Sequence, residues 1–303
     1  MKKNILITGG SGTVGQALTK ILQNSGYQVS HLSRSRKKNS SIKNYYWNID
    51  QFEIEAEAIL DNDIIVHLAG AGVFDSRWTE SYRKEILESR IRSTALLFES
   101  IRKSGKKLDA FVSASAIGIY GSATSSEWYS EESLPTDGFL ADVVKQWENE
   151  VDKIIEYSER IVKIRIGIVM SKTGGALEQL SMPIRYGIGA KLGHGNQWVP
   201  WIHIQDLCNI FQSAISNPNY TGTYNAASPF PITNNELTRE IAKTLNRPLI
   251  LPFVPAFVLE LILGKEKASF VLEGSRVSPN KLMKAGYQFQ FANIQDALKS
   301  LLL

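Results

Sequence analysis

The fold is decided by the N-terminal stretch Asn4-Ile-Leu-Ile-Thr8-Gly9-Gly10-Ser11-Gly12-Thr13-Val14-Gly15. Its apolar start predicts a buried strand, and its glycines predict a tight turn. Apolar residues then recur at helical spacing, Gly26 ends that helix, and residues 27–32 read as a second strand. A strand, a glycine turn, a helix and a strand within about 30 residues form one βαβ unit.

The same alternation continues to about residue 170. Strands are expected at 64–68, 110–113 and 162–169, with helices at 82–102 and 140–157. Beyond it, glycine-rich and proline-rich loops separate short helices at 204–216, 234–245 and 294–303. Strands that alternate with helices indicate a parallel sheet covered on both faces. We therefore predict an α/β fold, a doubly wound parallel Rossmann sheet with a smaller C-terminal substrate lobe.

The expected organisation has three parts. Residues 1–170 form a Rossmann domain to which later segments add strands, 171–251 form the substrate-lobe segments, and 252–303 form a small α-rich C-terminal domain. The first strand is expected near the centre of the sheet, with the cofactor across the carboxyl ends of the strands.

Composition excludes several classes of protein. The 303 residues are 43% apolar and 21% charged, as in ordinary globular proteins. A single cysteine, Cys208, forms no internal disulfide, and the four histidines lack metal-ligand spacing, so no metal is expected. No apolar run is long enough for a membrane span or a signal peptide. We expect a cytoplasmic protein, a monomer or homodimer, with no membrane partner.

The first 49 residues contain no acidic side chain, and the first acid is Asp50. The basic residues there are Lys2, Lys3, Lys20, Arg34, Arg36, Lys37, Lys38 and Lys43. This distribution fits a solvated basic face, weak nucleic-acid affinity, or a site for an anionic small molecule. The adjacent glycine turn favours the third interpretation, without a nucleic-acid partner.

That turn is typical of dinucleotide binding. Glycines at positions 9, 12 and 15 let the backbone approach a pyrophosphate, and the following helix N-terminus offers free N–H groups. The end of the second strand then selects the nucleotide. An NAD site needs an acid there for the ribose 2′-hydroxyl, but the sequence has Ser33 and Arg34. A guanidinium suits a phosphate, so NADP is favoured over NAD.

Several motifs occur in order along the chain. They are the Thr8–Gly15 turn, His67-Leu-Ala-Gly70, Ser113-Ala-Ser115-Ala-Ile-Gly-Ile-Tyr120-Gly121, Arg165-Ile-Gly-Ile-Val169, Trp201-Ile-His203-Ile-Gln-Asp206 and Ser278-Pro-Asn-Lys-Leu282. This series resembles the extended short-chain dehydrogenase/reductases. Within them it is similar to an atypical, epimerase-like family with an extra small C-terminal domain, whose members are often named nucleoside-diphosphate-sugar epimerases or cell-division inhibitors.

The resemblance implies roles for residues. Thr8, Gly9, Ser11, Gly12, Thr13, Val14 and Gly15 would form the pyrophosphate turn, Ser33 and Arg34 would meet the ribose and its phosphate, and Asp50 would lie by the adenine. Leu68, Ala69 and Gly70 would pass beside the ribose and nicotinamide. Ser115 would be the active-site serine, with Ser113 as the alternative.

The superfamily's Tyr-x-x-x-Lys pair is missing, because the corresponding helix offers only Phe139 with Val143 or Leu140 with Val144. Arg90 occupies the position of the superfamily's asparagine. We therefore predict an Arg90–Ser115 polar centre, with Arg77, Trp78 and His203 in the substrate pocket.

Two functions follow from this pattern. One is an NADP-dependent oxidoreductase or epimerase-like enzyme that acts on an unidentified small molecule of the nucleotide-sugar type, with an unusual acid or base. The other is a catalytically inactive NADP(H)-binding sensor or partner-binding module.

Overall fold

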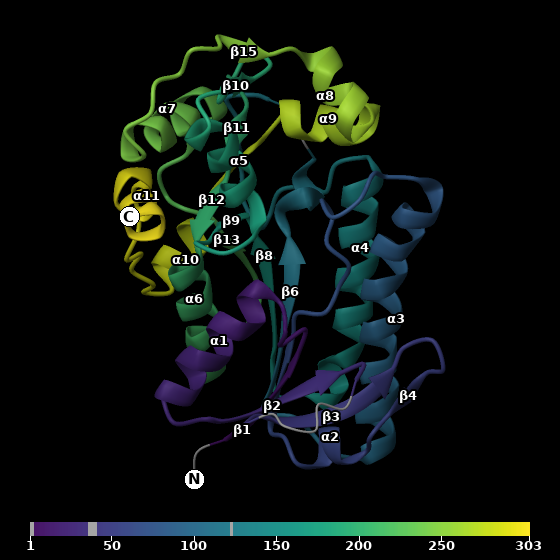
Figure 1. The fold of residues 1–303 in the computed structure, drawn as a ribbon. Coiled ribbons are helices and arrows are strands. Elements are labelled where there is room, and N and C mark those ends of the chain that lie inside the picture. Colours follow the sequence, from purple (N-terminus) through teal and green to yellow (C-terminus); the bar gives the residue numbers. More distant parts are fainter. Residues whose placement is uncertain (1–2, 36–40, 122–123) are drawn as a thin grey trace.

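The computed structural model describes residues 3–35, 41–121 and 124–303, which form a sheet between two helical layers and a smaller lobe above it (Figure 1). Within these residues, eight strands form the main sheet in the order β13-β8-β6-β5-β1-β2-β3-β4. In that order they are Gly222–Ala226, Ile161–Ile166, Ala110–Ala116, Ile64–His67, Asn4–Thr8, Gln28–Ser33, Lys43–Asn48 and Glu53–Ile54. The pairs are parallel except for β3 with β4.

The first strand is central, as predicted. β1 pairs with β2 on one side and with β5 on the other. The chain winds from β1 to β3 in one direction and from β5 to β13 in the other, so the strand order reverses beside β1. In such sheets a crevice opens at the carboxyl ends of the strands at this switch point.

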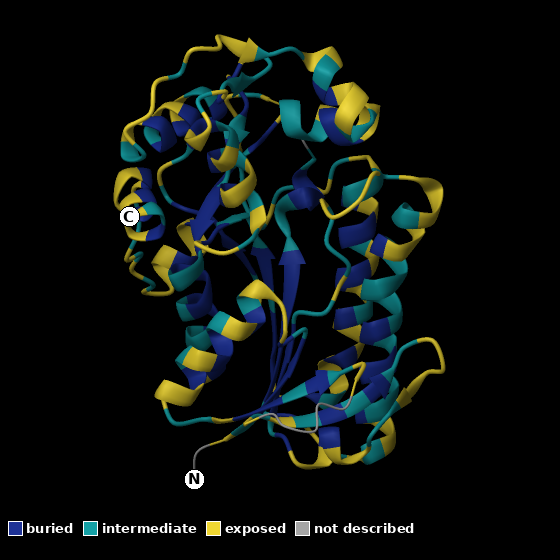
Figure 2. Cartoon of the chain, viewed as in Figure 1, coloured by how far each residue is buried: buried dark blue, intermediate teal, exposed yellow. Residues whose placement is uncertain are grey.

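Helices cover both faces of the sheet (Figure 1). α1 (Thr13–Asn24) packs beside α6 (Ile204–Ser216) on one face, and α3 (Glu80–Ser104) packs beside α4 (Phe139–Asp152) on the other. The strands β1, β5 and β6 between them are buried along almost their whole length (Figure 2). A strand buried on both faces needs an unbroken apolar run, which Ile5-Leu-Ile7 supplies.

The smaller lobe has its own hydrophobic core, built by α5, α7 and α11 around a few short strands. Its helices are α5 (Gly175–Arg185), α7 (Asn234–Thr244), α8 (Ala256–Leu263), α9 (Lys265–Leu272) and α11 (Ile294–Leu302). Its strand pairs are β9 (Ile168–Met170) with β12 (Trp201–His203), β10 (Lys191–Leu192) with β15 (Phe253–Val254), and β11 (Trp198–Val199) with β14 (Ile232–Thr233). The helix α10 (Asn280–Lys284) packs on β13, where Leu282 joins the core of the main sheet.

The remaining elements are short. They are α2 (Glu57–Leu60), the 3-10 turns η1 (Ile117–Tyr120) and η2 (Lys153–Tyr157), and the pair β7 (Trp128–Tyr129) with β16 (Arg276–Val277). None of the helices in the described part of the chain has the length and apolarity that crossing a bilayer requires.

Two expected elements divide where the chain changes direction. The strand expected at 162–169 ends at Ile166, and after Gly167 the chain enters β9 and pairs with β12 instead. A Cβ on Gly167 would overlap the Pro200 carbonyl oxygen, so only glycine fits this crossing. The helix expected at 140–157 is α-helical to Asp152 and continues as the 3-10 turn η2.

Candidate functional site

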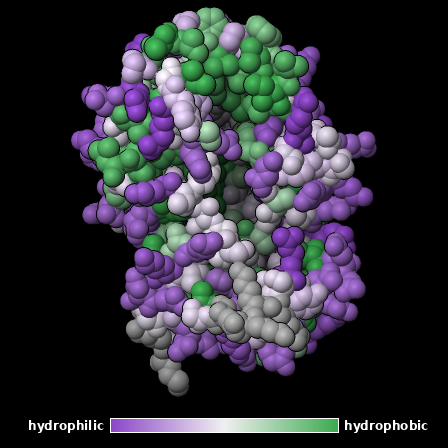
Figure 3. Space-filling model, in the orientation of Figure 1, coloured by the Kyte–Doolittle hydropathy of each residue, from purple (hydrophilic) through white to green (hydrophobic). Residues whose placement is uncertain are grey.

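A groove of about 680 Å³ lies across the carboxyl ends of β1, β2, β3 and β5. Figure 3 shows the surface hollowed between the sheet domain below and the smaller lobe above. Predicted cofactor residues that line the groove are Gly9, Ser11, Gly12, Ser33, Arg34, Leu68, Ala69 and Gly70. The structure thus gathers the turn after β1, the end of β2 and the segment after β5 around one space.

Gly12 lies where the groove meets the start of α1. It is the N-cap of α1, and its N–H donates to the Gly9 carbonyl at 3.0 Å. A Cβ on Gly12 would approach only the Gly9 oxygen, at 3.4 Å, so the Gly12 α-carbon faces open space. α1 has no side-chain cap, and its helical ladder starts with Gln16 N–H donating to Gly12. The N–H groups of Thr13, Val14 and Gly15, which precede this first bond of the helix, are therefore available to an anion.

Gly15 has a different role in the same turn. A Cβ there would overlap the Gly9 carbonyl oxygen, so Gly15 lets α1 pack closely against the turn. Gly9 has a φ of 69°, a left-handed conformation that glycine adopts without strain. The groove lining does not include Thr13, Val14 or Gly15. Their predicted contact with the cofactor would therefore come from backbone N–H groups.

Thr8 supports the groove from below. Its hydroxyl oxygen accepts hydrogen bonds from the N–H groups of Leu68 and Ala69, at 3.0 and 3.1 Å. Its own proton then goes to Nδ1 of the buried His67, at 2.8 Å. His67 Nε2 lies 3.1 Å from Thr94 Oγ1, whose proton is donated to the Arg90 carbonyl. This chain assigns the neutral, Nε2-protonated form to His67.

His67 makes the fold sensitive to acid. Burial, followed by the charge of Arg90, lowers the pKa of His67 to about 3. Unfolded His67 binds a proton below about pH 6.5 and folded His67 does not, so stability is complete above pH 6.5 and falls below it. We expect a loss of about 2 kcal/mol between pH 6.5 and pH 5, which His67→Asn removes. Denaturant melts of both proteins across this range would measure it, and parallel pH profiles would contradict it.

Ser33 and Arg34, the residues expected to select the nucleotide, both line the groove. Ser33 Oγ accepts from the Ser35 N–H at 3.3 Å, which fixes the turn after β2. Asp50 does not line the groove. Its side chain is 91% exposed and lies 3.5 Å from Arg92. The basic residues Lys2, Arg36, Lys37 and Lys38 lie outside the described residues.

Much of the groove wall consists of residues that the sequence did not single out. The additional lining residues include Gly10, Gln16, His31, Asn44, Trp47, Ala71, Gly72, Asp75, Tyr82, Glu85 and Ser89. Those on α3 contact the loop after β5, where Tyr82 donates its hydroxyl proton to the Gly72 carbonyl at 2.6 Å. A signal was present in the spacing of Tyr82, Glu85 and Ser89, which lie three and then four residues apart and therefore share one face of a helix.

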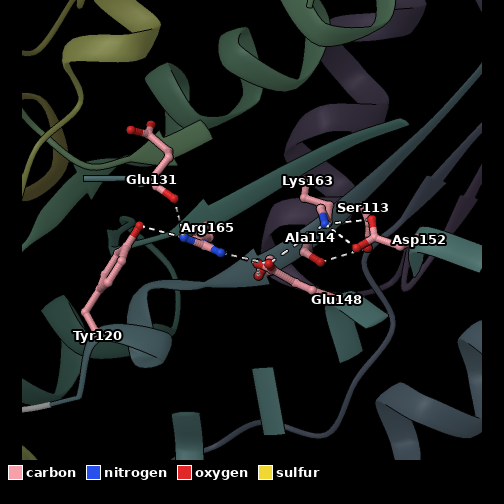
Figure 4. Close-up of polar contacts among 9 residues, drawn as sticks. Ser113, Ala114, Tyr120, Glu131, Glu148, Asp152, Lys163 and Arg165 are labelled. Carbon is pink, nitrogen blue, oxygen red and sulfur yellow. Dashed lines mark hydrogen bonds and ion pairs between the residues drawn. The ribbon is translucent and has the colours of Figure 1, made fainter. Parts of the chain in front are cut away.

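Ser115 is buried and bonds to Glu148, which belongs to the polar network with Arg165 and Tyr120 in Figure 4. Its hydroxyl donates to Glu148 Oε1 at 2.5 Å, and Arg165 donates to both oxygens of Glu148, at 2.9 and 2.8 Å. Burial raises the pKa of Glu148, but the hydrogen bonds and charge of Arg165 outweigh it and hold that pKa below its usual value. Tyr120 accepts from Arg165 at 2.8 Å and donates to Asn225.

The network limits what Ser115 can do. Because the ionised Glu148 only accepts hydrogen bonds, the Ser115 proton is engaged. Ser115 can accept a further hydrogen bond but cannot donate one without leaving Glu148. Its catalytic role stays a prediction under that restriction, and Ser113 donates its proton to the Ala114 carbonyl at 2.8 Å.

Arg90 lies close to the groove without lining it. Its guanidinium donates to the Ile86 carbonyl at 2.9 Å and stacks on Trp147, 5.2 Å from the ring centroid. It presses against Gly70, where a Cβ would be 3.2 Å from Arg90 Cζ. Burial lowers the pKa of Arg90 to about 10. Among the described residues, no carboxylate pairs with Arg90, and no hydrogen bond joins it to Ser115. Arg90 contacts Trp147 of α4, whereas Ser115 bonds to the next residue, Glu148.

Helix α4 offers apolar side chains where the superfamily has its tyrosine and lysine. Val143 and Val144 are buried, and Leu140 packs toward Gly118 at the end of η1. Arg77 and Trp78 line a second cavity of about 410 Å³ against the junction of α8 and α9, not the cofactor groove. The predicted Arg90–Ser115 centre therefore does not have Arg77 and Trp78 in the same cavity.

His203 is a helix cap. Its Nδ1 accepts from the Gln205 N–H at 3.0 Å at the start of α6, and its Nε2 pairs with Ser300. The ring stacks on Phe291, with centroids 3.8 Å apart. It lines neither described cavity, and its contacts connect α6 to α11. The expected substrate contact of His203 stays a prediction.

A doubly wound sheet with a glycine turn at a helix N-terminus and a groove across the strand ends defines a dinucleotide-binding Rossmann protein. The chain belongs to the epimerase family. Residues 5–141 match the NAD dependent epimerase/dehydratase family, and residues 254–301 match a domain of unknown function. The expected resemblance and fold class are thereby confirmed.

Individual relatives match along the whole chain. An epimerase family protein of Staphylococcus haemolyticus is 36% identical over 305 residues, 99% of each chain. The human epimerase family protein SDR39U1, solved with NADPH, has a TM-score of 0.88 at 30% identity over 98% of each chain. A nucleoside-diphosphate sugar epimerase from Corynebacterium glutamicum has a TM-score of 0.80 at 30% identity, over 99% of this chain and 58% of its own.

Proposed function

We propose that the groove binds NADP(H) in preference to NAD(H). The observation that carries this proposal is the open space at Gly12, beside the uncapped N-terminus of α1, with Arg34 lining the same groove. Gly12 and the first N–H groups of α1 would hold the pyrophosphate, and Arg34 with Ser33 would hold a 2′-phosphate. The NADPH bound to the human relative supports the same choice.

Replacing Arg34 by alanine tests the phosphate contact. The loss of a charge-assisted hydrogen bond costs about 1.5–3 kcal/mol, so the NADPH Kd should rise roughly 10- to 100-fold. NADH lacks the phosphate and should bind unchanged. Fluorescence titration with both cofactors measures this, and Arg102→Ala is the control because Arg102 is an exposed arginine that lies outside the groove. An equal loss for both cofactors would end the phosphate assignment.

The reaction we propose is of the oxidoreductase or epimerase type on a small molecule of the nucleotide-sugar class. The bound cofactor supplies hydride chemistry, and the chain must bind and orient the substrate. Arg90 carries a charge that no described carboxylate neutralises, so it would stabilise negative charge on a substrate oxygen. Ser115 would accept a hydrogen bond, consistent with its bond to Glu148.

The test of catalysis is a library of nucleotide sugars and small carbonyl compounds, followed by NADPH absorbance. Turnover should fall in Arg90→Met while NADPH affinity is retained. Arg102→Met is the control, since Arg102 is a solvent-exposed arginine on the same helix. Turnover that survives in Arg90→Met would exclude Arg90 from the chemistry.

A second candidate function is an NADP(H)-binding sensor without turnover. It is favoured by the apolar Leu140 and Val144 at the usual proton-donor positions and by the engaged proton of Ser115. Tight NADPH binding together with no absorbance change across the library supports this candidate. Any substrate-dependent oxidation of NADPH rules it out.

A further inference from the structure

Helix α9 holds the loop between β5 and α3 through a buried lysine. Lys267 is 5% exposed, and its ammonium donates to the carbonyls of Phe74 and Ser76, at 2.9 and 3.1 Å. The same ammonium lies 5.1 Å from the centre of the Phe74 ring. A buried ammonium needs such partners, because taking its charge out of water is costly. Lys267 therefore connects the C-terminal lobe to Phe74 and Ser76, which lie 193 and 191 positions earlier in the chain.

Further contacts between the lobe and the loop surround this lysine. Arg83, in the first turns of α3, donates to both oxygens of Glu266 at 2.9 Å. Arg77 donates to the Leu261 carbonyl at 3.3 Å. Phe270 packs on Trp78, with ring centroids 6.2 Å apart. The contacts come from both α8 and α9 and reach along the whole segment from 74 to 83.

The segment held in this way continues into the wall of the cofactor groove. Asp75 lies between the two carbonyls that Lys267 binds, and it lines the groove together with Gly70, Ala71 and Gly72. The sheet domain also holds this wall, since the Tyr82 hydroxyl of α3 donates a hydrogen bond to the Gly72 carbonyl. Lys267 is therefore the point at which the C-terminal lobe reaches the groove wall.

We propose that Lys267 is a positioning residue for the cofactor groove, and that the region matched as a domain of unknown function serves to hold residues 70–76 in the binding conformation. The proposal rests on the proposed NADP(H) site. It assigns α9 a role in cofactor affinity through the Phe74 and Ser76 carbonyls, without contact between Lys267 and the cofactor.

Replacing Lys267 by methionine tests this role at nearly constant side-chain length. Phe74 and Ser76 are themselves exposed, so water can reach their carbonyls and the loop should loosen without global unfolding. If the loop then keeps the binding conformation in about one molecule in ten, the NADPH Kd rises about tenfold. Hydrogen exchange of the unliganded protein should increase at residues 70–79 and stay unchanged in β1 and β6. The control is Lys265→Met, because Lys265 is an exposed lysine two positions earlier on α9. It should change neither the NADPH Kd nor the hydrogen exchange of residues 70–79.

The outcomes separate the two proposals. Faster exchange at 70–79 with weaker NADPH binding supports the positioning role. Unchanged exchange, or faster exchange with an unchanged Kd, overturns it. A wild-type protein that binds neither NADPH nor NADH overturns the proposed function, while the exchange measurement still decides whether Lys267 holds the loop.

A charge-reversal pair covers the case in which Lys267→Met fails to fold. Glu266→Arg places two cations together at the surface and should speed exchange of the loop. Adding Arg83→Glu restores opposite charges and should bring exchange and NADPH affinity back toward the wild type. A double variant no better than the single one contradicts the clamp.

Discussion

Valine in place of Gly12 is expected to abolish NADPH binding while the protein stays folded. The Gly12 backbone is extended, with φ −75° and ψ 168°, so valine fits its conformation. Its β-carbon would meet only the Gly9 oxygen, at 3.4 Å, but its methyl groups would fill the space beside the α1 N-terminus. Overpacking costs about 1–3 kcal/mol, and lost phosphate contacts add to it, so we expect at least a ~100-fold rise in Kd.

Two further variants interpret that result. Gly12→Ala adds one carbon and should weaken binding less than valine does. Gly15→Val should lower both binding and melting temperature, because its β-carbon would overlap the Gly9 carbonyl. Titration and thermal melts of the three variants together show whether Gly12 faces the ligand. Full affinity in Gly12→Val would mean that the turn is only structural.

The fold could be predicted because its signals are local. A buried strand, a glycine turn and an amphipathic helix each occupy a few consecutive residues, and their order alone fixes a doubly wound sheet. The helix expected at 204–216 has those bounds in the structure. Gly9 and Gly12 could be assigned to the groove because close backbone approach to a pyrophosphate requires glycine at that turn.

Side-chain partners across the chain could not be predicted in the same way. Glu148 and Arg165 are 17 residues apart on a helix and a strand, and only the packing of α4 on the sheet brings them to Ser115. His203 lies between two isoleucines in the sequence, a pattern that does not distinguish a ligand from a helix cap. Its partner Ser300 is 97 residues away.

The same limit applies to Arg77 and Trp78. Arg77 and Trp78 follow the strand expected at 64–68, so the sequence places them near the strand ends where substrates bind. The wall opposite them comes from α8 and α9, which no spacing in the sequence relates to residue 77. The cavity they line is therefore a product of how the C-terminal lobe docks.

Replacing Arg165 by methionine is expected to destabilise the protein strongly. Arg165 is 9% exposed and holds Glu148, Ser115's acceptor, in its ionised form. Removing one partner of a buried ion pair costs about 3–5 kcal/mol because the other charge stays buried. For a chain of this size that lowers the melting temperature by roughly 5–8 °C. Arg102→Met, which breaks an exposed pair with Glu99, should cost less than about 1 kcal/mol.

The pH dependence identifies the cause of this loss. Without Arg165, burial raises the folded pKa of Glu148 above its unfolded value, so the penalty exists above pH 4.5 and disappears as Glu148 is protonated. The gap in melting temperature between wild type and Arg165→Met should therefore be widest near pH 8 and close toward pH 4.5. Glu148→Gln added to Arg165→Met should recover part of the loss at pH 8, because no buried charge remains. A gap that is constant with pH would mean that lost packing, not the stranded carboxylate, sets the stability of this network.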